Sequence, residues 1–153
     1  MPSKAKTVSA LETHLGYWLR YVSNHVSHAF ALKVQERGVT VAEWVVLREL
    51  YDRDAMPSAL ADRIGMTRGA ISKLAERLIA KRLISRKASA EDRRSQTLAL
   101  TAEGRALVPG LAALADENDR EFFGDLAPVT RDAIEKAMKE IVHRRGLRAV
   151  PVD

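Results

Sequence analysis

Apolar residues recur every three or four positions over most of this chain, which is the spacing of one face of an α-helix. The first such stretch covers residues 10–35, and Gly38 stands where a glycine would end that helix. Thr40 opens a second helix, and Glu43 follows at the three-residue spacing of a capping box. We expect this helix to end in the polar run at residues 52–54.

Two shorter helical patterns follow and are separated by a glycine. The first covers about residues 58–64, and Gly65 breaks it. Thr67 is placed to cap the second, over about residues 68–81, which has one apolar stripe and an opposite side that is polar and basic. Two close helices joined at a glycine are typical of a helix-turn-helix unit.

Period-two alternation and a charged tip between two short apolar runs predict a β-hairpin at residues 83–87 and 96–100. Thr101 then caps a long helix, and a last helix covers about residues 130–145. The pattern thus predicts a mainly α fold, a winged helix-turn-helix with six helices and a two-stranded wing. The first helix and the last two are too apolar on one side to stand alone, so we expect them to pair two copies of the chain.

The chain therefore divides into parts of one domain. Residues 1–9 are expected to form a flexible arm, residues 10–38 and 101–148 the dimerisation helices, and residues 39–100 the DNA-binding lobe. No apolar run approaches the ~20 residues of a membrane span, and the first ten residues lack the apolar core of a secretory signal. We expect a cytoplasmic protein without a membrane partner.

The positive charge lies in one segment. The net charge of the chain is +5. Between Arg63 and Arg94, ten Lys and Arg residues stand against three acidic ones, a net +7, so the rest of the chain sums to −2. Any single basic helix is most often only solvated, but here the charge coincides with the helix-turn-helix and its hairpin. That coincidence favours double-stranded DNA as the partner.

A helix that reads the major groove presents short polar and basic side chains near its N-terminus. The residues that meet this demand are Thr67, Arg68, Gly69 and Ser72. Lys73 and Arg77 lie further along the helix and would reach phosphates. At the hairpin tip, an arginine can enter the minor groove. Asp92 would repel DNA there unless it were paired, so we expect it to hold Arg94 in position.

The segment LADRIGMTRGAISKLAERLIAKRLISRKASAEDRRSQTLALTAEGRAL resembles the winged helix-turn-helix core of the multiple antibiotic resistance regulator (MarR) family, and the likeness extends over nearly the whole chain. Its most specific parts are the LADRIGMTRGAISKL run, the D-R-R tip and the LTAEG that follows. The resemblance implies a homodimer that binds a palindromic operator, with one recognition helix in each of two successive major grooves. Many such proteins are repressors that small phenolic or aromatic carboxylate ligands release.

The resemblance also implies site residues. The implied DNA contacts are Thr67, Arg68, Gly69, Ser72, Lys73 and Arg77, with Arg94 at the wing tip and Lys87 and Arg93 at the DNA backbone. The chain departs from the family at the end of the recognition helix, where Lys81-Arg82 replaces the usual glycine. A left-handed arginine there costs about 1 kcal/mol, so either the cap differs or Arg82 reaches a phosphate. The absence of cysteine excludes the peroxide-sensing mechanism of one branch of the family.

Six of the eight aromatic residues lie in the first third of the chain. In the family the effector pocket lies between the dimerisation helices and the DNA-binding lobe, where the first two helices converge. An aromatic acid would suit a pocket there. Its predicted lining residues are Tyr17, Tyr21, His25, Trp44 and Arg48. The alternative is that aromatic residues such as Trp18, Phe30 and Trp44 only pack in the core or at the dimer interface.

Other chemistry has little support in the sequence. His25 and His28 are spaced to share a cation on a helix, but two histidines without further ligands are a weak signal, so no metal and no cofactor is expected. No glycine-rich phosphate loop or nucleophile motif is present, which argues against an enzyme. The remaining alternative is an architectural DNA-binding protein that responds to no effector.

Overall fold

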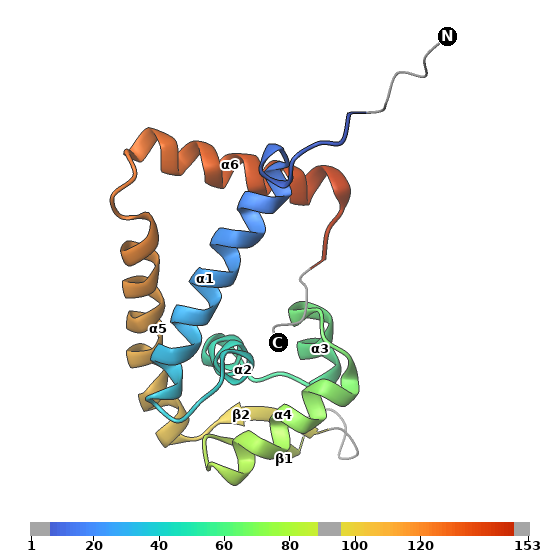
Figure 1. Ribbon diagram of the computed structural model, residues 1–153. Helices are drawn as coiled ribbons and strands as arrows, with labels where there is room; N and C mark the ends of the chain where they lie inside the picture. The colour runs from blue at the N-terminus through green and yellow to red at the C-terminus, as the bar shows by residue number, and fades with distance from the viewer. Residues whose placement is uncertain (1–6, 89–95, 149–153) are drawn as a thin grey trace.

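A computed structural model describes residues 7–88 and 96–148 of the chain (Figure 1). Within these ranges the fold is mainly helical and contains the predicted helix-turn-helix and two-stranded wing. In chain order the elements are a 3-10 turn η1 (Leu11–Thr13), α1 (Leu15–Gln35), α2 (Val41–Asp52), α3 (Pro57–Ile64), α4 (Arg68–Ala80), β1 (Ile84–Ala88), β2 (Gln96–Leu100), α5 (Ala102–Phe123) and α6 (Pro128–Arg145).

Three threonines begin helices as predicted. The Thr40 hydroxyl accepts from the Glu43 amide at 3.1 Å, and the Glu43 carboxylate accepts from the Thr40 amide at 3.2 Å, which completes the capping box. The hydroxyls of Thr67 and Thr101 likewise accept from the amides three residues on. Each hydroxyl satisfies a backbone donor that has no partner within its helix.

The first and last helices differ from the predicted ranges. The stretch predicted as one helix over residues 10–35 is interrupted at His14, where the backbone is extended. There the Thr13 hydroxyl donates to the Ala10 carbonyl at 2.7 Å, and such a local bond competes with helical pairing. The last helix begins at Pro128 rather than at residue 130, because a proline in the first turn has the helical φ and needs no amide donor.

The wing is a two-stranded antiparallel sheet that pairs Ile84 with Leu100 and Ala88 with Gln96 at its two ends. Its first strand begins one residue later than predicted, because the Leu83 amide donates back to the Leu78 carbonyl of α4 at 3.0 Å. Ala55, just before α3, forms a bridge with Leu98 on the other side of β2. The wing is thus attached to the body of the lobe through β2.

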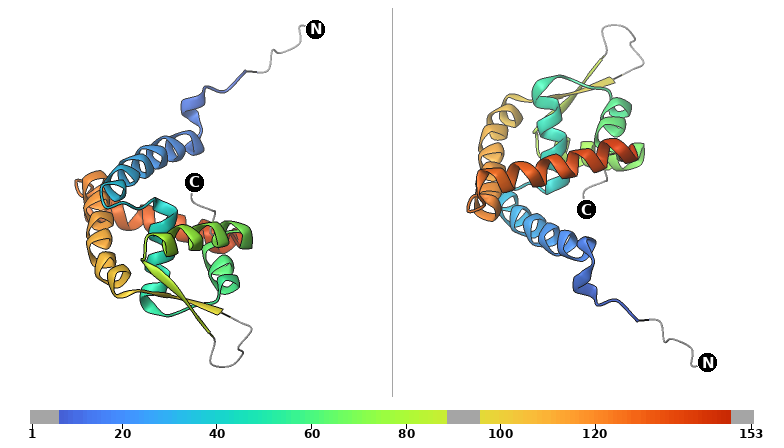
Figure 2. Two further views of the ribbon diagram at one scale, coloured as in Figure 1. Left: turned by 90° about the horizontal axis from the view of Figure 1, so that it is seen from below. Right: turned by 90° about the horizontal axis from the view of Figure 1, so that it is seen from above.

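The core lies mainly within the lobe formed by α2, α3, α4, the wing and the first half of α5, and Val34 at the end of α1 also packs in it. Its largest fully buried apolar side chains include Leu47, Leu50, Leu60, Ile71, Leu78, Ile84, Leu98 and Leu111. Figure 1 shows α1 and α5 running from this lobe to α6 at the top of the view. Figure 2 shows that α1 and α6 diverge, although they cross in the projection of Figure 1.

The helices outside the lobe leave apolar side chains uncovered. No residue of α6 is buried, and α1 buries only Val34. The large exposed apolar side chains on these two helices are Leu15, Trp18, Leu19, Tyr21, Val22 and Leu32 on α1, and Val129, Ile134, Met138, Ile141 and Val142 on α6. None of the helices described is both long and apolar enough to cross a bilayer.

Candidate nucleic-acid interface

The helix-turn-helix is formed by α3 and α4, and its turn depends on one glycine. Gly65 has a φ of 77°, a left-handed conformation in which its amide and that of Met66 both donate to the Ala61 carbonyl at the end of α3. Thr67 then caps α4. On α4 the apolar stripe Ile71, Leu74, Ala75 and Leu78 is buried. The opposite face of α4 is therefore held outward by the packing of its apolar side.

The six predicted contact residues on and before α4 share this outward face. All are exposed: Thr67, Arg68, Gly69, Ser72, Lys73 and Arg77. Apart from the adjacent residues and the backbone of α4 itself, no atom lies within 4 Å of the position that a Cβ would take at Gly69, so this glycine is not required by packing against other parts of the chain. The arrangement presents short side chains at the N-terminus of α4 and two long cations further along. The contacts themselves stay predictions.

Two carboxylates near this surface are neutralised by ion pairs with basic residues of the wing. Arg86 on β1 pairs with Glu76 on α4, the acidic residue of the outward face. Lys87 Nζ lies 3.6 Å from the Asp54 carboxylate, so a backbone phosphate would compete with that exposed pair for the predicted Lys87 contact. Asp92, Arg93 and Arg94, with the pairing expected between Asp92 and Arg94, lie outside the described residues.

The end of α4 confirms that Arg82 occupies a position that favours glycine. Its φ is 62°. The Arg82 amide donates to the Ile79 carbonyl and the Leu83 amide to the Leu78 carbonyl, the two bonds of a Schellman motif. The cap therefore keeps the usual geometry with an arginine in the glycine place, and a phosphate contact by Arg82 stays a prediction.

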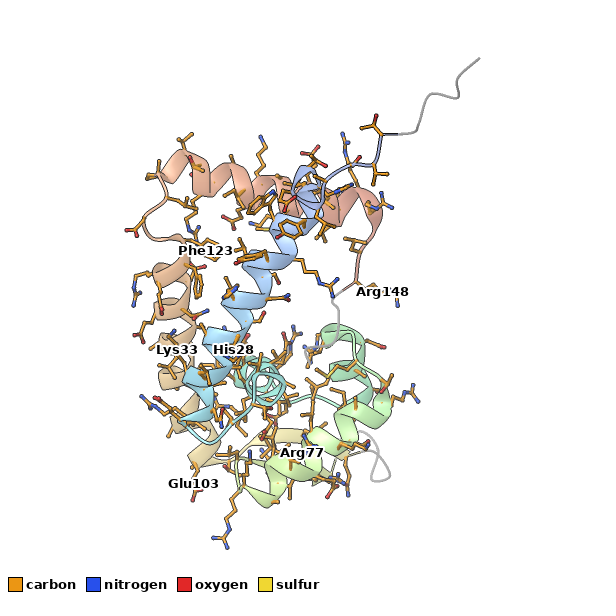
Figure 3. The ribbon with its side chains drawn as sticks, in the orientation of Figure 1. His28, Lys33, Arg77, Glu103, Phe123 and Arg148 are labelled. Atoms are coloured by element: carbon orange, nitrogen blue, oxygen red, sulfur yellow. The ribbon has the colours of Figure 1, made fainter. Side chains whose placement is uncertain are left out.

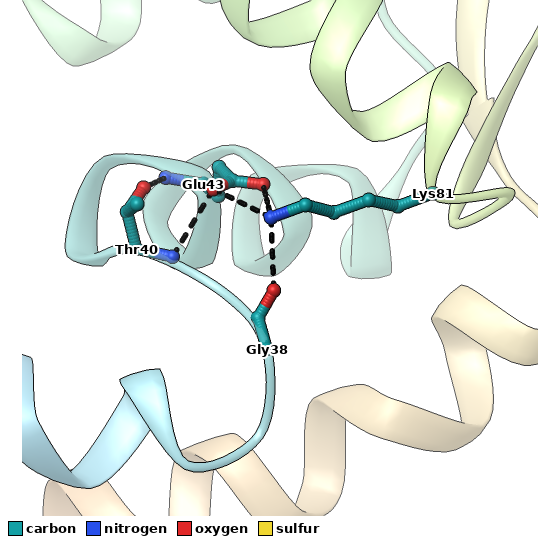
Figure 4. A network of polar contacts seen from close by, with 4 residues as sticks. All are labelled: Gly38, Thr40, Glu43 and Lys81. Carbon is teal, nitrogen blue, oxygen red and sulfur yellow. Dashed lines mark hydrogen bonds and ion pairs between the residues drawn. The ribbon is translucent and has the colours of Figure 1, made fainter.

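A polar network at this end of α4 was missed by the sequence reasoning (Figure 4). The Lys81 ammonium group contacts both carboxylate oxygens of Glu43 on α2, at 2.8 and 3.0 Å, and the Gly38 carbonyl at 2.8 Å. The sequence shows Glu43 only as part of a capping box and Lys81 only as one cation among ten. Thirty-eight residues separate them, so no local spacing signals the pair.

The five predicted effector residues fall into two groups in the structure. Tyr17, Tyr21 and His25 follow one side of α1, and the Tyr21 and His25 rings lie 5.1 Å apart. Trp44 on α2 packs edge-on against Phe30 beside the core, while the Arg48 guanidinium donates to Asp52 at 2.9 Å. The two clefts described next are lined by other residues.

A cleft of about 240 Å³ lies between α1 and α5, with Val41 of α2 at its edge. Its polar wall contains the buried Asn118, whose amide donates to the Val26 carbonyl at 3.1 Å. Lys33 donates to the Asn118 oxygen at 3.0 Å and to Glu121 at 2.7 Å. Figure 3 labels Lys33 on α1 and, on α5, Phe123, which lines the cleft. One sequence signal points to this polar wall. Asn118 is a polar residue that continues the apolar stripe of Leu107, Leu111 and Leu114.

A second cleft, of about 220 Å³, separates the end of α5 from α6 and shares Asp119 and Phe123 with the first. Arg131 donates to Asp119 at 2.8 Å, and this bond raises the pKa of the guanidinium. A hydrogen bond and the charge of Lys139 lower the pKa of Glu135 below its usual value. The exposed Arg131–Asp119 pair fixes the start of α6 against α5 only weakly, and the Glu135–Lys139 pair lies within α6.

His25 and His28, which the sequence spaces to share a cation, are not part of a larger cluster of metal-binding side chains in the part of the chain that is described. His25 and His28 are both exposed on α1. No group of three or more His, Asp or Glu side chains that could hold a metal ion occurs among residues 7–88 and 96–148.

Comparison with known proteins agrees with this geometry. The family model of the MarR family matches residues 37–95. The transcriptional regulator HosA of Escherichia coli O157:H7 is 23% identical over 106 residues, which are 69% of this chain and 78% of HosA.

Two solved structures are similar over most of their length. BpsR of Bordetella bronchiseptica, whose DNA binding is regulated by 6-hydroxynicotinic acid, is 25% identical, with a TM-score of 0.78 over 88% of this chain and 97% of BpsR. A probable transcriptional regulator from Pseudomonas aeruginosa is 26% identical, with a TM-score of 0.77 over 86% of this chain and 99% of that protein. The helix-turn-helix, the wing and these matches together support a winged-helix, DNA-binding transcriptional regulator of the MarR family.

Proposed function

We propose that the protein is a homodimeric repressor that binds a palindromic operator and is released by a small aromatic acid. The observation that carries the proposal is the outward face of α4, where Arg68, Lys73 and Arg77 stand exposed beside the wing while the other face is packed in the core. One α4 helix would enter each of two successive major grooves. Wing residue Arg94 would reach the adjacent minor groove.

The dimer is supported by the apolar side chains that one copy leaves uncovered. They lie on α1 and α6, outside the lobe that carries α4. A second copy that covers them would bury this surface and would set the spacing between the two α4 helices. In this proposal residues 10–38 and 101–148 dimerise, residues 39–100 bind DNA, and residues 1–9 are an arm.

The effector is supported by the chemistry of the predicted residues and by a relative. BpsR, a similar protein, responds to 6-hydroxynicotinic acid, an aromatic acid. Trp44 provides an aromatic wall, and Arg48, which is exposed and paired with Asp52, could exchange that partner for the carboxylate of a ligand. Tyr17, Tyr21 and His25 would complete such a site from α1.

A gel-shift assay with the DNA upstream of its own gene tests the proposal. The wild-type protein should retard this fragment at low salt, and the binding should weaken steeply as salt rises because phosphate neutralisation dominates affinity. Arg68→Ala and Arg94→Ala should each weaken it, and aromatic acids should release it. The absence of any retarded band at low salt would sink the proposal. A sequence-independent footprint with no response to aromatic acids would support an architectural protein instead.

A further inference from the structure

We propose that Lys81, at the end of the recognition helix, is a positioning residue that fixes α4 to the first turn of α2 through the buried Glu43, and that it does not contact DNA. This inference rests on the proposed function, in which α4 enters the major groove. It adds a determinant of operator affinity that lies among basic residues but acts within the protein.

The contacts of the Lys81 ammonium group account for all of its donors. A lysine ammonium has three N–H bonds. Lys81 Nζ lies 2.8 Å from the Gly38 carbonyl, 2.8 Å from Glu43 Oε2 and 3.0 Å from Glu43 Oε1 (Figure 4). Each of these distances is within the normal range for a hydrogen bond. A phosphate could therefore be bound only after one of these bonds is broken.

The partner of Lys81 is a buried carboxylate, which requires hydrogen-bond and charge partners within the protein. The Glu43 side chain is 1% exposed, whereas that of Lys81 is 40% exposed. Glu43 also accepts from the Thr40 amide at the N-terminus of α2, where the helix dipole favours a negative charge. Because a buried charge without partners strongly destabilises a protein, this carboxylate holds Lys81 in place.

The network joins elements with different roles in DNA binding. Lys81 is the last residue before the left-handed turn that leads from α4 into the wing. Glu43 lies on α2, and Gly38 lies in the turn that connects α2 to α1, a helix of the proposed dimerisation region. Two recognition helices read a palindrome only when both keep the correct spacing and angle. The Lys81–Glu43 pair holds the end of α4 on α2, and the bond from Lys81 to the Gly38 carbonyl ties it to the turn that leads to α1.

The direction in which Glu43→Gln changes operator affinity distinguishes a positioning role of Glu43 from a purely electrostatic one. Removing an acidic residue raises DNA affinity when only the electrostatic field matters. Glutamine preserves the size of Glu43 and its role in the capping box but not its charge. We expect Glu43→Gln and Lys81→Met each to lower operator affinity at least fivefold. The double variant should be no weaker than the weaker single variant, because both changes break the same link.

The salt dependence separates positioning from a direct phosphate contact. Losing one phosphate contact reduces the slope of log K against log salt by about 0.9. Lys73→Met should show this reduction, whereas Lys81→Met should lose affinity at an unchanged slope. Glu36→Gln, a charge change at an exposed residue beyond the end of α1, should not lower affinity.

The experiment is fluorescence anisotropy of the full-length dimer with labelled upstream DNA at several salt concentrations, with circular dichroism to show that each variant is folded. A slope for Lys81→Met that falls as it does for Lys73→Met would overturn the inference, and so would unchanged or higher affinity of Glu43→Gln. Should Glu43→Gln fail to fold, the slope for Lys81→Met decides alone. Wild-type protein that fails to bind this DNA would instead contradict the proposed function, independently of Lys81.

Discussion

At the residue scale, Arg82 has the least favourable backbone of the described chain, since it alone among the non-glycine residues there has a positive φ. Its neighbours enforce this conformation. The amides of Arg82 and Leu83 donate back into α4, and the Thr101 hydroxyl donates to the Arg82 carbonyl at 2.7 Å. The turn into the wing is thus fixed from both sides, and the arginine adopts a shape in which its Cβ is crowded.

We expect Arg82→Gly to raise the free energy of unfolding by up to about 1 kcal/mol, because glycine relieves the left-handed strain but loses more entropy on folding. Urea denaturation measures this. Arg82→Ala is the matched control, since alanine removes the same side chain and keeps the strain. Equal stabilisation by both variants would show that the backbone is not the cause.

Gly69 separates stability from DNA binding at a single position. We expect Gly69→Ala to stabilise the protein by up to about 1 kcal/mol, because alanine favours the helix and its Cβ would meet open space. We also expect operator affinity to fall, because the added methyl projects from the groove-facing side of α4. Thermal denaturation and anisotropy measure the two effects. Gly16→Ala, at the second position of α1, is the stability control; undiminished affinity of Gly69→Ala would contradict the predicted placement of α4.

At the element scale, the sequence predicts most of the fold because its signals are local. Period-three-and-four apolar spacing and the threonines Thr40, Thr67 and Thr101 place the helix starts, and Gly65 places the turn between α3 and α4. What the sequence misses depends on contacts between distant residues. The Lys81–Glu43 pair, the Asn118 wall of the cleft and the divergence of α1 and α6 all arise from how the helices pack.

The start of α5 is packed so closely on the turn after α4 that only glycine fits at position 104. A Cβ there would lie 2.0 Å from the Leu83 carbonyl oxygen, which the Thr101 amide also contacts. We expect Gly104→Ala to destabilise the protein by at least about 2 kcal/mol, because backbone atoms must move. Gly110→Ala is the control, since its Cβ would meet only the end of the Arg37 side chain. Similar urea midpoints for the two variants would contradict this packing.

At the scale of the whole molecule, the chain has a lobe with a buried core and, outside it, a frame of helices formed by α1, α6 and the second half of α5. The lobe holds the core and presents α4, while α1 and α6 expose apolar side chains and the two clefts lie along α5. A single copy carries one recognition helix. Both halves of a palindrome can therefore be bound only by the proposed dimer. The clefts lie in that frame, next to the helices that would set the spacing of the two α4 helices.

We expect Ile141→Glu on α6 to dissociate the dimer and to lower operator affinity at least tenfold, because a carboxylate replaces a half-exposed apolar side chain in the proposed interface. Sedimentation equilibrium measures the mass. Lys136→Glu, an exposed change on the same helix, should remain dimeric. A wild-type protein that sediments as a monomer would contradict the pairing.

The most direct test of the central claim is a hydroxyl-radical footprint of the wild-type protein on the DNA upstream of its gene. A dimer that places one α4 in each of two successive major grooves predicts two related protected segments whose centres lie about 10 base pairs apart. Arg68→Ala should weaken both segments together. A footprint without defined boundaries, or no protection at low salt, would contradict the account.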